Sequence, residues 1–227
     1  MSQITAATFD FLNDLAENNN REWFTKHKDR YESSHKEMIA FAEDLYDLMI
    51  EEDNLVPMTG KKVLFRIYRD VRFAKDKSPY KSHWSVRFKR ATALLRGGYY
   101  FHIKPGESYA AGGFWRPNSE DMRRIREDIA ADDKPYRRIF AKSQFQDMFG
   151  RMIGEKVKTA PKGFSKDHPA IDLLRHKQFL LHRDFSDEEV LAPDFAEKIR
   201  DTFLAMHPFF DHMSEVLTTD GNGNPIV

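Results

Sequence analysis

Three stretches of the sequence, each with its own hydrophobic period, predict an α+β fold. Apolar residues recur at helical spacing through residues 9–49 and again through 195–217. Between them, residues 85–89 and 99–104 alternate between apolar and polar side chains. Alternating segments that are close together and joined by short turns favour an antiparallel sheet over parallel crossovers. We therefore expect an antiparallel sheet of about five strands flanked by N-terminal and C-terminal helices.

The chain is expected to form one domain over residues 1–220, followed by a flexible tail at residues 221–227. Its 227 residues contain no internal repeat, low-complexity tract or long linker. A chain of this length buries roughly 70–75% of the surface that its unfolded form exposes, which is enough for a substantial core. The Gly- and Asn-rich end of the sequence has no apolar residue to anchor it until Ile226.

The N-terminal third is predicted to form two helices. The first ends at the three asparagines 18–20, and Asn19 with Glu22 has the spacing of a capping pair that opens the second. An unbroken second helix over residues 20–52 would be about 50 Å long. We therefore expect it either to span the molecule or to break near Ser33 and Ser34.

The later elements follow from the same patterns. Strands are expected at residues 63–68, 85–89, 99–104, 108–115 and 177–185. The sequence from Pro117 to Asp121 places capping side chains before carboxylates, which is typical of a helix start. Three further helical regions are expected: one within residues 136–149, a short helix that ends near Arg175, and a last helix over residues 195–217.

Composition excludes several classes of protein. The chain has no cysteine, so disulfides and thiolate chemistry are excluded. The first residues lack a basic segment followed by an apolar one, and no apolar run approaches the ~18 residues of a membrane helix. We expect a cytoplasmic protein with no membrane partner; the sequence does not indicate its oligomeric state.

Common enzyme motifs are absent from the sequence. Gly60-Lys61 lacks the earlier glycine of a P-loop, the C-terminal glycines fail the dinucleotide fingerprint, and no Gly-x-Ser-x-Gly elbow occurs. His207 and His212 are five residues apart, which takes them off a shared helix face. No metal and no cofactor is therefore expected.

The positive charge of the chain is concentrated in one segment. The 36 basic and 36 acidic residues cancel, yet residues 61–90 hold eleven cations and two anions, a net charge of +9. The rest of the chain therefore carries −9. Such a segment either faces an anionic partner or neutralises acidic helices packed against it.

Within this segment lies the run Arg-x-x-Arg-Asp-x-Arg-Phe-x-x-Asp-Lys-x-x-Tyr, at residues 66–80. It resembles the signature of the bacterial family "domain of unknown function 2461". Asn18-Asn19 before Trp23-Phe24, the turn at residues 112–117 and the sequence at 161–164 agree with it. The resemblance extends from about residue 8 to residue 185. It implies a shared scaffold and brings no activity with it.

From the residues themselves, we predict a site for a small phosphate- or carboxylate-bearing ligand. Guanidinium groups are planar two-pronged donors that match the oxygens of such anions. Asp70 is expected to orient an arginine, Gly113 to let backbone N–H groups approach, and Trp115 to wall the pocket. The predicted ligand-binding residues are Arg66, Arg69, Asp70, Arg72, Lys77, Tyr80, Gly113 and Trp115.

Three alternatives remain open at this stage. The arginines and Asp70 could form a purely structural network in an interaction protein, with Glu22 or another helix acid absorbing Arg66. Aromatic residues interleaved with cations could bind single-stranded nucleic acid, although Phe65 and Phe88 are expected to face the core. An enzyme would use Asp70 or His102 as its base, and these two residues are the catalytic candidates of this sequence.

Overall fold

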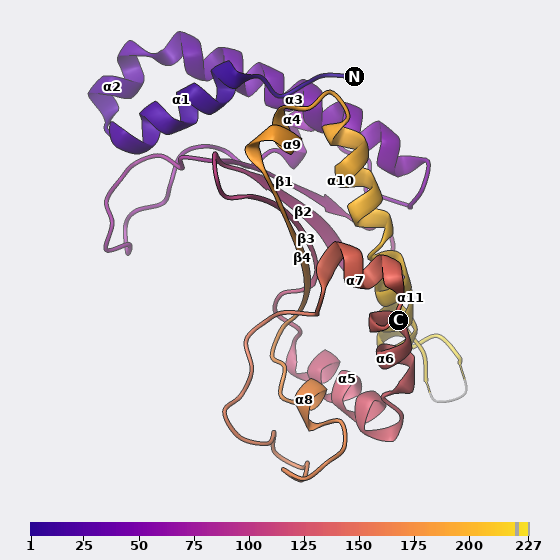
Figure 1. The fold of residues 1–227 in the computed structure, drawn as a ribbon. Helices are drawn as coiled ribbons and strands as arrows, with labels where there is room; N and C mark the ends of the chain where they lie inside the picture. The colour runs from indigo at the N-terminus through magenta and orange to yellow at the C-terminus, as the bar shows by residue number, and fades with distance from the viewer. Residues whose placement is uncertain (221–222, 227) are drawn as a thin grey trace. The chain divides into compact units, whose positions relative to one another are not determined.

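A four-stranded antiparallel sheet, with strand order β1-β2-β3-β4, runs through the computed structural model, which describes residues 1–220 and 223–226 (Figure 1). The strands are β1 (Trp84–Lys89), β2 (Gly98–Ile103), β3 (Ser108–Phe114) and β4 (Phe179–Phe185). The predicted α+β class is confirmed. Each of the four matches an expected strand. The fifth expected strand, at residues 63–68, is not a strand of the sheet.

The segment expected to be a strand at residues 63–68 begins instead as one helical turn, α4 (Gly60–Val63). Consecutive residues Val63 and Leu64 are both buried, which breaks the alternation of a strand. The segment then makes only isolated bridges, from Leu64 to Val86 and from Tyr68 to Tyr80. Phe65 was expected to face the core and is 42% exposed, so that expectation was wrong.

The described chain divides into two compact units, and each of the four strands of the sheet contributes residues to both. Unit 1 comprises Met1–Phe88, Tyr100–Ala110 and Asp184–Asp201, and unit 2 comprises Lys89–Tyr99, Ala111–Arg183 and Thr202–Val227. The helices of unit 1 are α1 (Ala6–Glu17), α2 (Arg21–Lys26), α3 (Lys28–Ile50), α4 and α9 (Asp187–Leu191). Those of unit 2 are α5 (Ser119–Ala131), α6 (Lys134–Phe140), α7 (Ser143–Phe149), α8 (Ile171–Leu174) and α11 (His207–Thr218), while α10 (Phe195–Leu204) contributes to both units. The one-domain organisation expected for residues 1–220 stays a prediction.

Unit 1 packs its helices through aromatic side chains. Phe41 of α3 meets Phe101 of β2 edge to face at 5.8 Å and Phe195 of α10 at 5.7 Å. The break between α2 and α3 falls at His27, rather than near Ser33 and Ser34 as expected. Ser34 lies inside α3, and its hydroxyl accepts the indole N–H of buried Trp84 at 2.8 Å.

Unit 2 has a second aromatic core. Tyr99 lies 4.9 Å from Phe203 and 5.3 Å from Phe210, measured between ring centroids. The helix expected over 195–217 is interrupted between α10 and α11, where Pro208 occupies the first turn of α11. Proline has no N–H to donate and its ring clashes with the preceding turn, so a new helix starts there.

The end of the chain returns to α11. Pro225 bridges Thr219, and the N–H of Ile226 donates to the carbonyl of Thr218 at 2.9 Å. The expected tail at residues 221–227 falls partly on 221, 222 and 227, which lie outside the described residues. Among residues 1–220 and 223–226, no helix has the length and apolar character needed to cross a bilayer.

Candidate functional site

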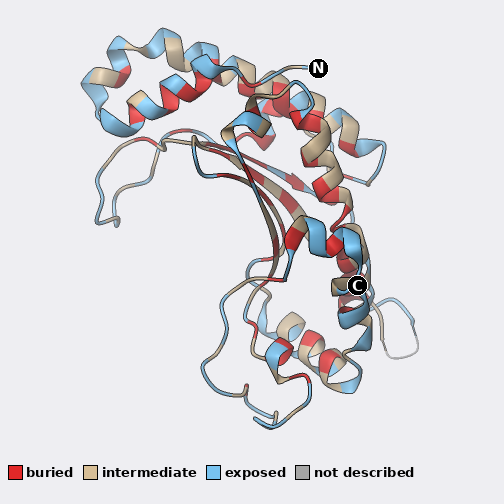
Figure 2. Cartoon of the chain, in the orientation of Figure 1, coloured by how far each residue is buried: buried red, intermediate tan, exposed pale blue. Residues whose placement is uncertain are grey.

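The basic motif forms a hairpin that we call the arm, residues Tyr68–Tyr80. Two backbone bonds close its base: Arg69 N–H donates to the carbonyl of Pro79 at 2.9 Å, and Lys81 N–H donates to that of Ile67 at 2.8 Å. In Figure 1 the arm is the long purple loop between α4 and β1. Figure 2 shows it in pale blue and tan for most of its length, so it is held by something other than an apolar core.

Asp76 holds the middle of the arm together. Its carboxylate accepts the backbone N–H of Ser78 at 2.9 Å and the Ser78 hydroxyl at 2.6 Å, and it pairs with the guanidinium of Arg69. The same guanidinium donates to the carbonyl of Ser78 at 3.1 Å. The bonds from Ser78 and then from Arg69 keep the pKa of Asp76 below its ordinary value. Arg69 and Asp76 are therefore structural members of the arm.

The tip of the arm is organised by a second charged pair. Asp70 accepts from Arg72 Nε at 3.0 Å and from Arg72 Nη2 at 2.7 Å, a two-pronged contact. These bonds lower the pKa of Asp70. Lys77 Nζ donates to the carbonyls of Val71 at 3.0 Å and Arg72 at 3.3 Å. Asp70 thus orients Arg72, in agreement with the expectation that it would orient an arginine. The ammonium group of Lys77 is bonded to backbone oxygens.

Tyr80 closes the base of the arm against the N-terminal helices. It is 6% exposed, and its ring stacks on that of Phe24 at 3.9 Å with an interplanar angle of 10°. The Asn19 side chain bonds both backbone groups of Tyr80, donating to its carbonyl at 2.9 Å and accepting its N–H at 3.1 Å. The expected capping role passes to Asn20, whose side chain accepts the N–H of Trp23. Asn19 is an anchor for the arm.

Arg66 lies just before the arm and is exposed. Within the described chain it makes no hydrogen bond or ion pair, although its charge lowers the pKa values of Lys81 and Asp70. Glu22, the helix acid considered as its partner, pairs with Lys26 at 2.9 Å instead. Arg66 therefore keeps its guanidinium donors available.

Five rings form a continuous group beside the arm, here called the aromatic row. Its centre is His102 on β2, which lies 4.1 Å from His83 and is stacked on Tyr109 of β3 at 4.9 Å. Tyr100 lies 5.8 Å from Tyr109, and its hydroxyl is 3.2 Å from His102 Nδ1. Phe65 completes the row 6.3 Å from Tyr100. All five side chains belong to unit 1, and none is buried.

The two histidines of the row are neutral. Burial, then the charges of His102, Lys81, Lys104 and Arg69, lower the pKa of His83 to about 3. Burial and Lys104 lower the pKa of His102 to about 4. Cations therefore surround two imidazoles that carry no charge of their own at neutral pH.

The cations beside the row are only partly balanced. Lys104 pairs with Glu107, an exposed carboxylate that also acts on His102. Lys81 places its Nζ 5.4 Å from the centre of the Phe65 ring and has no carboxylate partner in the described residues. Burial lowers the pKa of Lys81, and the positive charge of Arg66 lowers it further.

Gly113 and Trp115 belong to unit 2 and are described with it. Gly113 has φ +128°, and a Cβ there would overlap the carbonyl oxygen of Phe179. This glycine is needed for the close approach of β3 and β4. Trp115, directly after β3, is 60% exposed.

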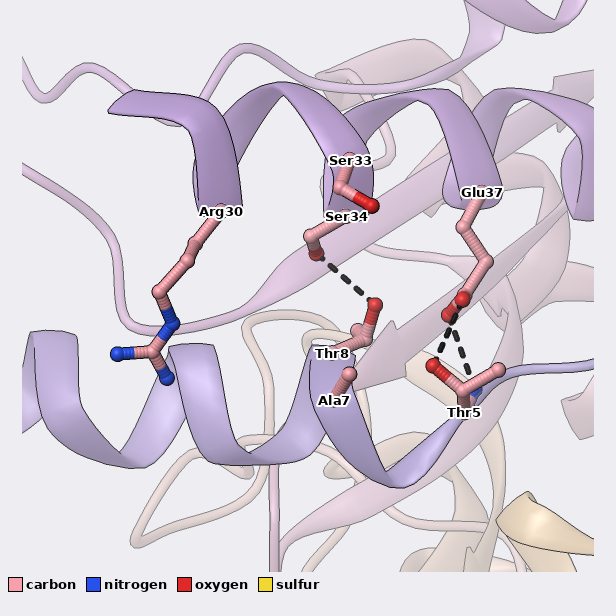
Figure 3. Close-up of a pocket in the computed structure, with 7 residues that line it drawn as sticks. All are labelled: Thr5, Ala7, Thr8, Arg30, Ser33, Ser34 and Glu37. Carbon is pink, nitrogen blue, oxygen red and sulfur yellow. Dashed lines mark hydrogen bonds between the residues drawn. The ribbon is translucent and has the colours of Figure 1, made fainter. Parts of the chain in front are cut away.

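A cavity of about 110 Å³ lies between α1 and α3 (Figure 3). The polar side chains at its wall bond one another: Thr8 donates to Ser34 at 3.1 Å, and Glu37 accepts the N–H and the hydroxyl of Thr5 at 2.9 and 2.8 Å. Arg30 pairs with Asp14 at 2.7 Å. The cavity therefore offers room for a few water molecules and no uncompensated charge.

Sequence reasoning included His102 as a candidate base but missed Tyr100, Tyr109 and Lys81 as site residues. The alternation of the two strands carried the signal: Tyr100 and His102 occupy half-exposed positions of β2, and Tyr109 occupies a half-exposed position of β3. Large polar rings on the half-exposed face of neighbouring strands are brought together by the pleat. Among the described residues, no three His, Asp or Glu side chains meet as a metal-binding set.

Comparison with known proteins shows the family of the chain. No curated protein and no solved structure matches the chain. The family model described as "conserved hypothetical protein (DUF2461)" matches residues 7–212. The match includes the arm and the aromatic row, and it continues through α10 into α11. The chain is a member of the conserved hypothetical protein family DUF2461.

Proposed function

We propose that unit 1 binds a small anionic group, a phosphate or a carboxylate, at the aromatic row and the neighbouring cations Arg66 and Lys81. The observation that carries the proposal is that two cations at the base of the arm, Arg66 and Lys81, have no carboxylate partner in the described part of the chain. The bond from Lys81 N–H to the carbonyl of Ile67 at 2.8 Å brings Lys81 next to the residue that follows Arg66. An anion that binds there lowers the electrostatic free energy of both cations. The arginines within the arm serve to hold its shape.

The row supplies the rest of an anion site. Its imidazoles and phenol groups provide N–H and O–H donors, and the edges of its rings carry positive partial charge. An anion bound there would favour protonation of His83 and His102, so each histidine would add charge when the ligand binds. This compensation is available only because both are neutral beforehand.

Of the two candidate bases, His102 suits a catalytic role better than Asp70. A base must have a lone pair to accept a proton, and neutral His102 has one. The carboxylate of Asp70 is bound on both oxygens by Arg72, which weakens it as a base. The proposal itself is limited to binding.

A thermal-shift series tests the proposal. Phosphate, sulfate, carboxylates and mononucleotides are compared with chloride at constant ionic strength. A ligand at 100 times its Kd stabilises the folded state by about 2.7 kcal/mol, which raises the Tm of a chain this long by about 5–10 °C. We expect such a rise for at least one of these anions, and none for chloride.

Variants locate the site. Lys81→Met keeps the length and the apolar contact of the side chain while removing its charge, and Arg66→Ala removes the free guanidinium. Both should abolish most of the shift. Lys28→Ala is the matched control, because Lys28 is an exposed cation of unit 1 paired with Glu32 on α3. A shift of equal size in all four proteins would contradict the proposed site.

A further inference from the structure

We infer that the ligand of this surface is single-stranded nucleic acid, with a backbone phosphate at the aromatic row and a base stacked on Phe73 of the arm. The inference rests on the proposed anion site and names the class of its ligand. It starts from an exposed aromatic side chain that the anion site does not use.

Phe73 is 97% exposed and makes no ring contact in the described chain. Its neighbours are fixed: Arg72 pairs with Asp70, and the carbonyls of Val71 and Arg72 accept from Lys77. The charged residues of the motif thus build an ordered tip that presents a bare phenyl ring to solvent. A ring exposed in this way has both faces open to a stacking partner.

Two further aromatic residues lie at the other end of the same segment. Tyr68 is 48% exposed and Phe65 is 42% exposed, so exposed rings occur at the base and at the tip of the arm. A mononucleotide has one base to stack, whereas a strand offers a base at each position. Rings at both ends therefore favour a polymer.

The charge of the segment fits a phosphodiester backbone. Residues 66–81 hold six cations and two anions, a net charge of +4. Arg66, Lys75 and Lys81 are interleaved with the exposed rings and form no ion pair with any described residue. Alternating cations and aromatic rings are the pattern of sequence-tolerant single-strand binding, in which cations follow the backbone and bases stack on rings.

An anionic membrane surface fits less well. Insertion needs apolar side chains gathered at one tip, and at the tip of the arm only Phe73 is a large exposed apolar residue. The exposed rings are instead spread along the segment. The charge alone would suit either partner, so the experiment must separate stacking from apolar insertion.

The test measures the affinity of the full chain for labelled 20-nucleotide oligo(dT) and oligo(U) by fluorescence anisotropy at 50 and 200 mM salt. Loss of one base-stacking side chain is expected to weaken binding about 5- to 150-fold. We therefore expect Phe73→Ala to lose that much affinity, Phe73→Trp to retain it, and Phe73→Leu to behave as Phe73→Ala. Arg66→Ala should also reduce the slope of log affinity against log salt concentration by about 0.7, the value for one phosphate contact on a single strand.

Several outcomes would overturn the inference. The protein would bind neither oligonucleotide, or Phe73→Ala would bind as tightly as wild type, or Lys28→Ala would lose as much affinity as Phe73→Ala. Binding of phosphatidylserine vesicles that Phe73→Leu preserves, together with no oligonucleotide binding, would assign the arm to a membrane. If inorganic phosphate or a mononucleotide still raises Tm through Arg66 and Lys81 while oligonucleotides do not bind, the anion site stands and the polymer is excluded.

Discussion

The imidazole rings of His83 and His102 lie 4.1 Å apart, and both are neutral at pH 7 because burial and nearby cations oppose their protonation. The group facing them includes Lys81, Lys104, Arg69 and the carboxylate of Glu107. Two uncharged imidazoles in a cationic surrounding make the site sensitive to acid and to anions. Both properties can be measured.

We expect the free protein to lose stability between pH 6.5 and about pH 4, and part of that loss to come from this pair. The folded-state pKa values are depressed, so the unfolded chain takes up protons first as pH falls below 6.5. Each histidine lowers the free energy of unfolding by up to about 1.4 kcal/mol per pH unit, and by less where solvent screens its partly exposed ring.

The check is the change in Tm between pH 7 and pH 5 for wild type, His83→Gln and His102→Gln. Each variant should show a smaller change than wild type. His35, His176 and His212, whose pKa values burial also lowers, stay in every variant and contribute to the remaining acid sensitivity. Identical acid profiles for all three proteins would show that the pair titrates normally.

Removal of the Asn19 side chain should detach the base of the arm. The change Asn19→Ala removes two part-buried hydrogen bonds to the backbone of Tyr80, and we expect the free energy of unfolding to fall by about 1–3 kcal/mol. The matched control is Asn18→Ala, whose side chain makes one exposed bond to the carbonyl of Asp14. Urea unfolding gives both values, and a larger loss in the control would refute the role assigned to Asn19.

The two aspartates of the arm should differ in their effects. Asp76→Ala removes the acceptor for Arg69 and Ser78, whereas Asp70→Ala releases only the exposed Arg72. Trypsin cleaves after Lys and Arg, so its rate of cleavage within residues 66–81 reports the order of the arm. We expect several-fold faster cleavage in Asp76→Ala than in Asp70→Ala; the reverse order would mean that the tip pair holds the arm.

Ser34 and Ser33 provide a second matched pair, in unit 1. Ser34→Ala leaves the buried indole N–H of Trp84 without its acceptor and should cost about 1–3 kcal/mol. Ser33 borders the same cavity and makes no hydrogen bond with another described side chain (Figure 3), so Ser33→Ala should change stability by less than about 0.5 kcal/mol. Equal losses would place the cost in the helix itself rather than in the bond to Trp84.

The spacing of apolar residues predicted most of the fold, because a helix or strand with one buried face needs apolar side chains at regular intervals in the sequence. All four strands of the sheet and the helical ends of the chain were found in this way. The helix breaks were harder, since the break at His27 has no Gly or Pro to mark it. The predicted strand at 63–68 failed because alternation over six residues does not separate a strand from one helical turn followed by isolated bridges.

The candidate site was predicted less well than the fold. The motif at 66–80 was identified from its charge, but the sequence could not show which cations are consumed by their neighbours. Arg69 and Arg72 are paired within the arm, while Arg66 is not. The aromatic row combines side chains from a loop and two strands, and such a group becomes visible only once strand pairing is known.

The most direct test of the central claim is NMR titration of the His83 and His102 imidazoles, with and without saturating phosphate. Without phosphate we expect both rings to stay neutral down to about pH 5. With phosphate both pKa values should rise, because the bound anion stabilises the protonated rings. Ordinary values near 6.5 that do not respond to phosphate would contradict the proposed anion site.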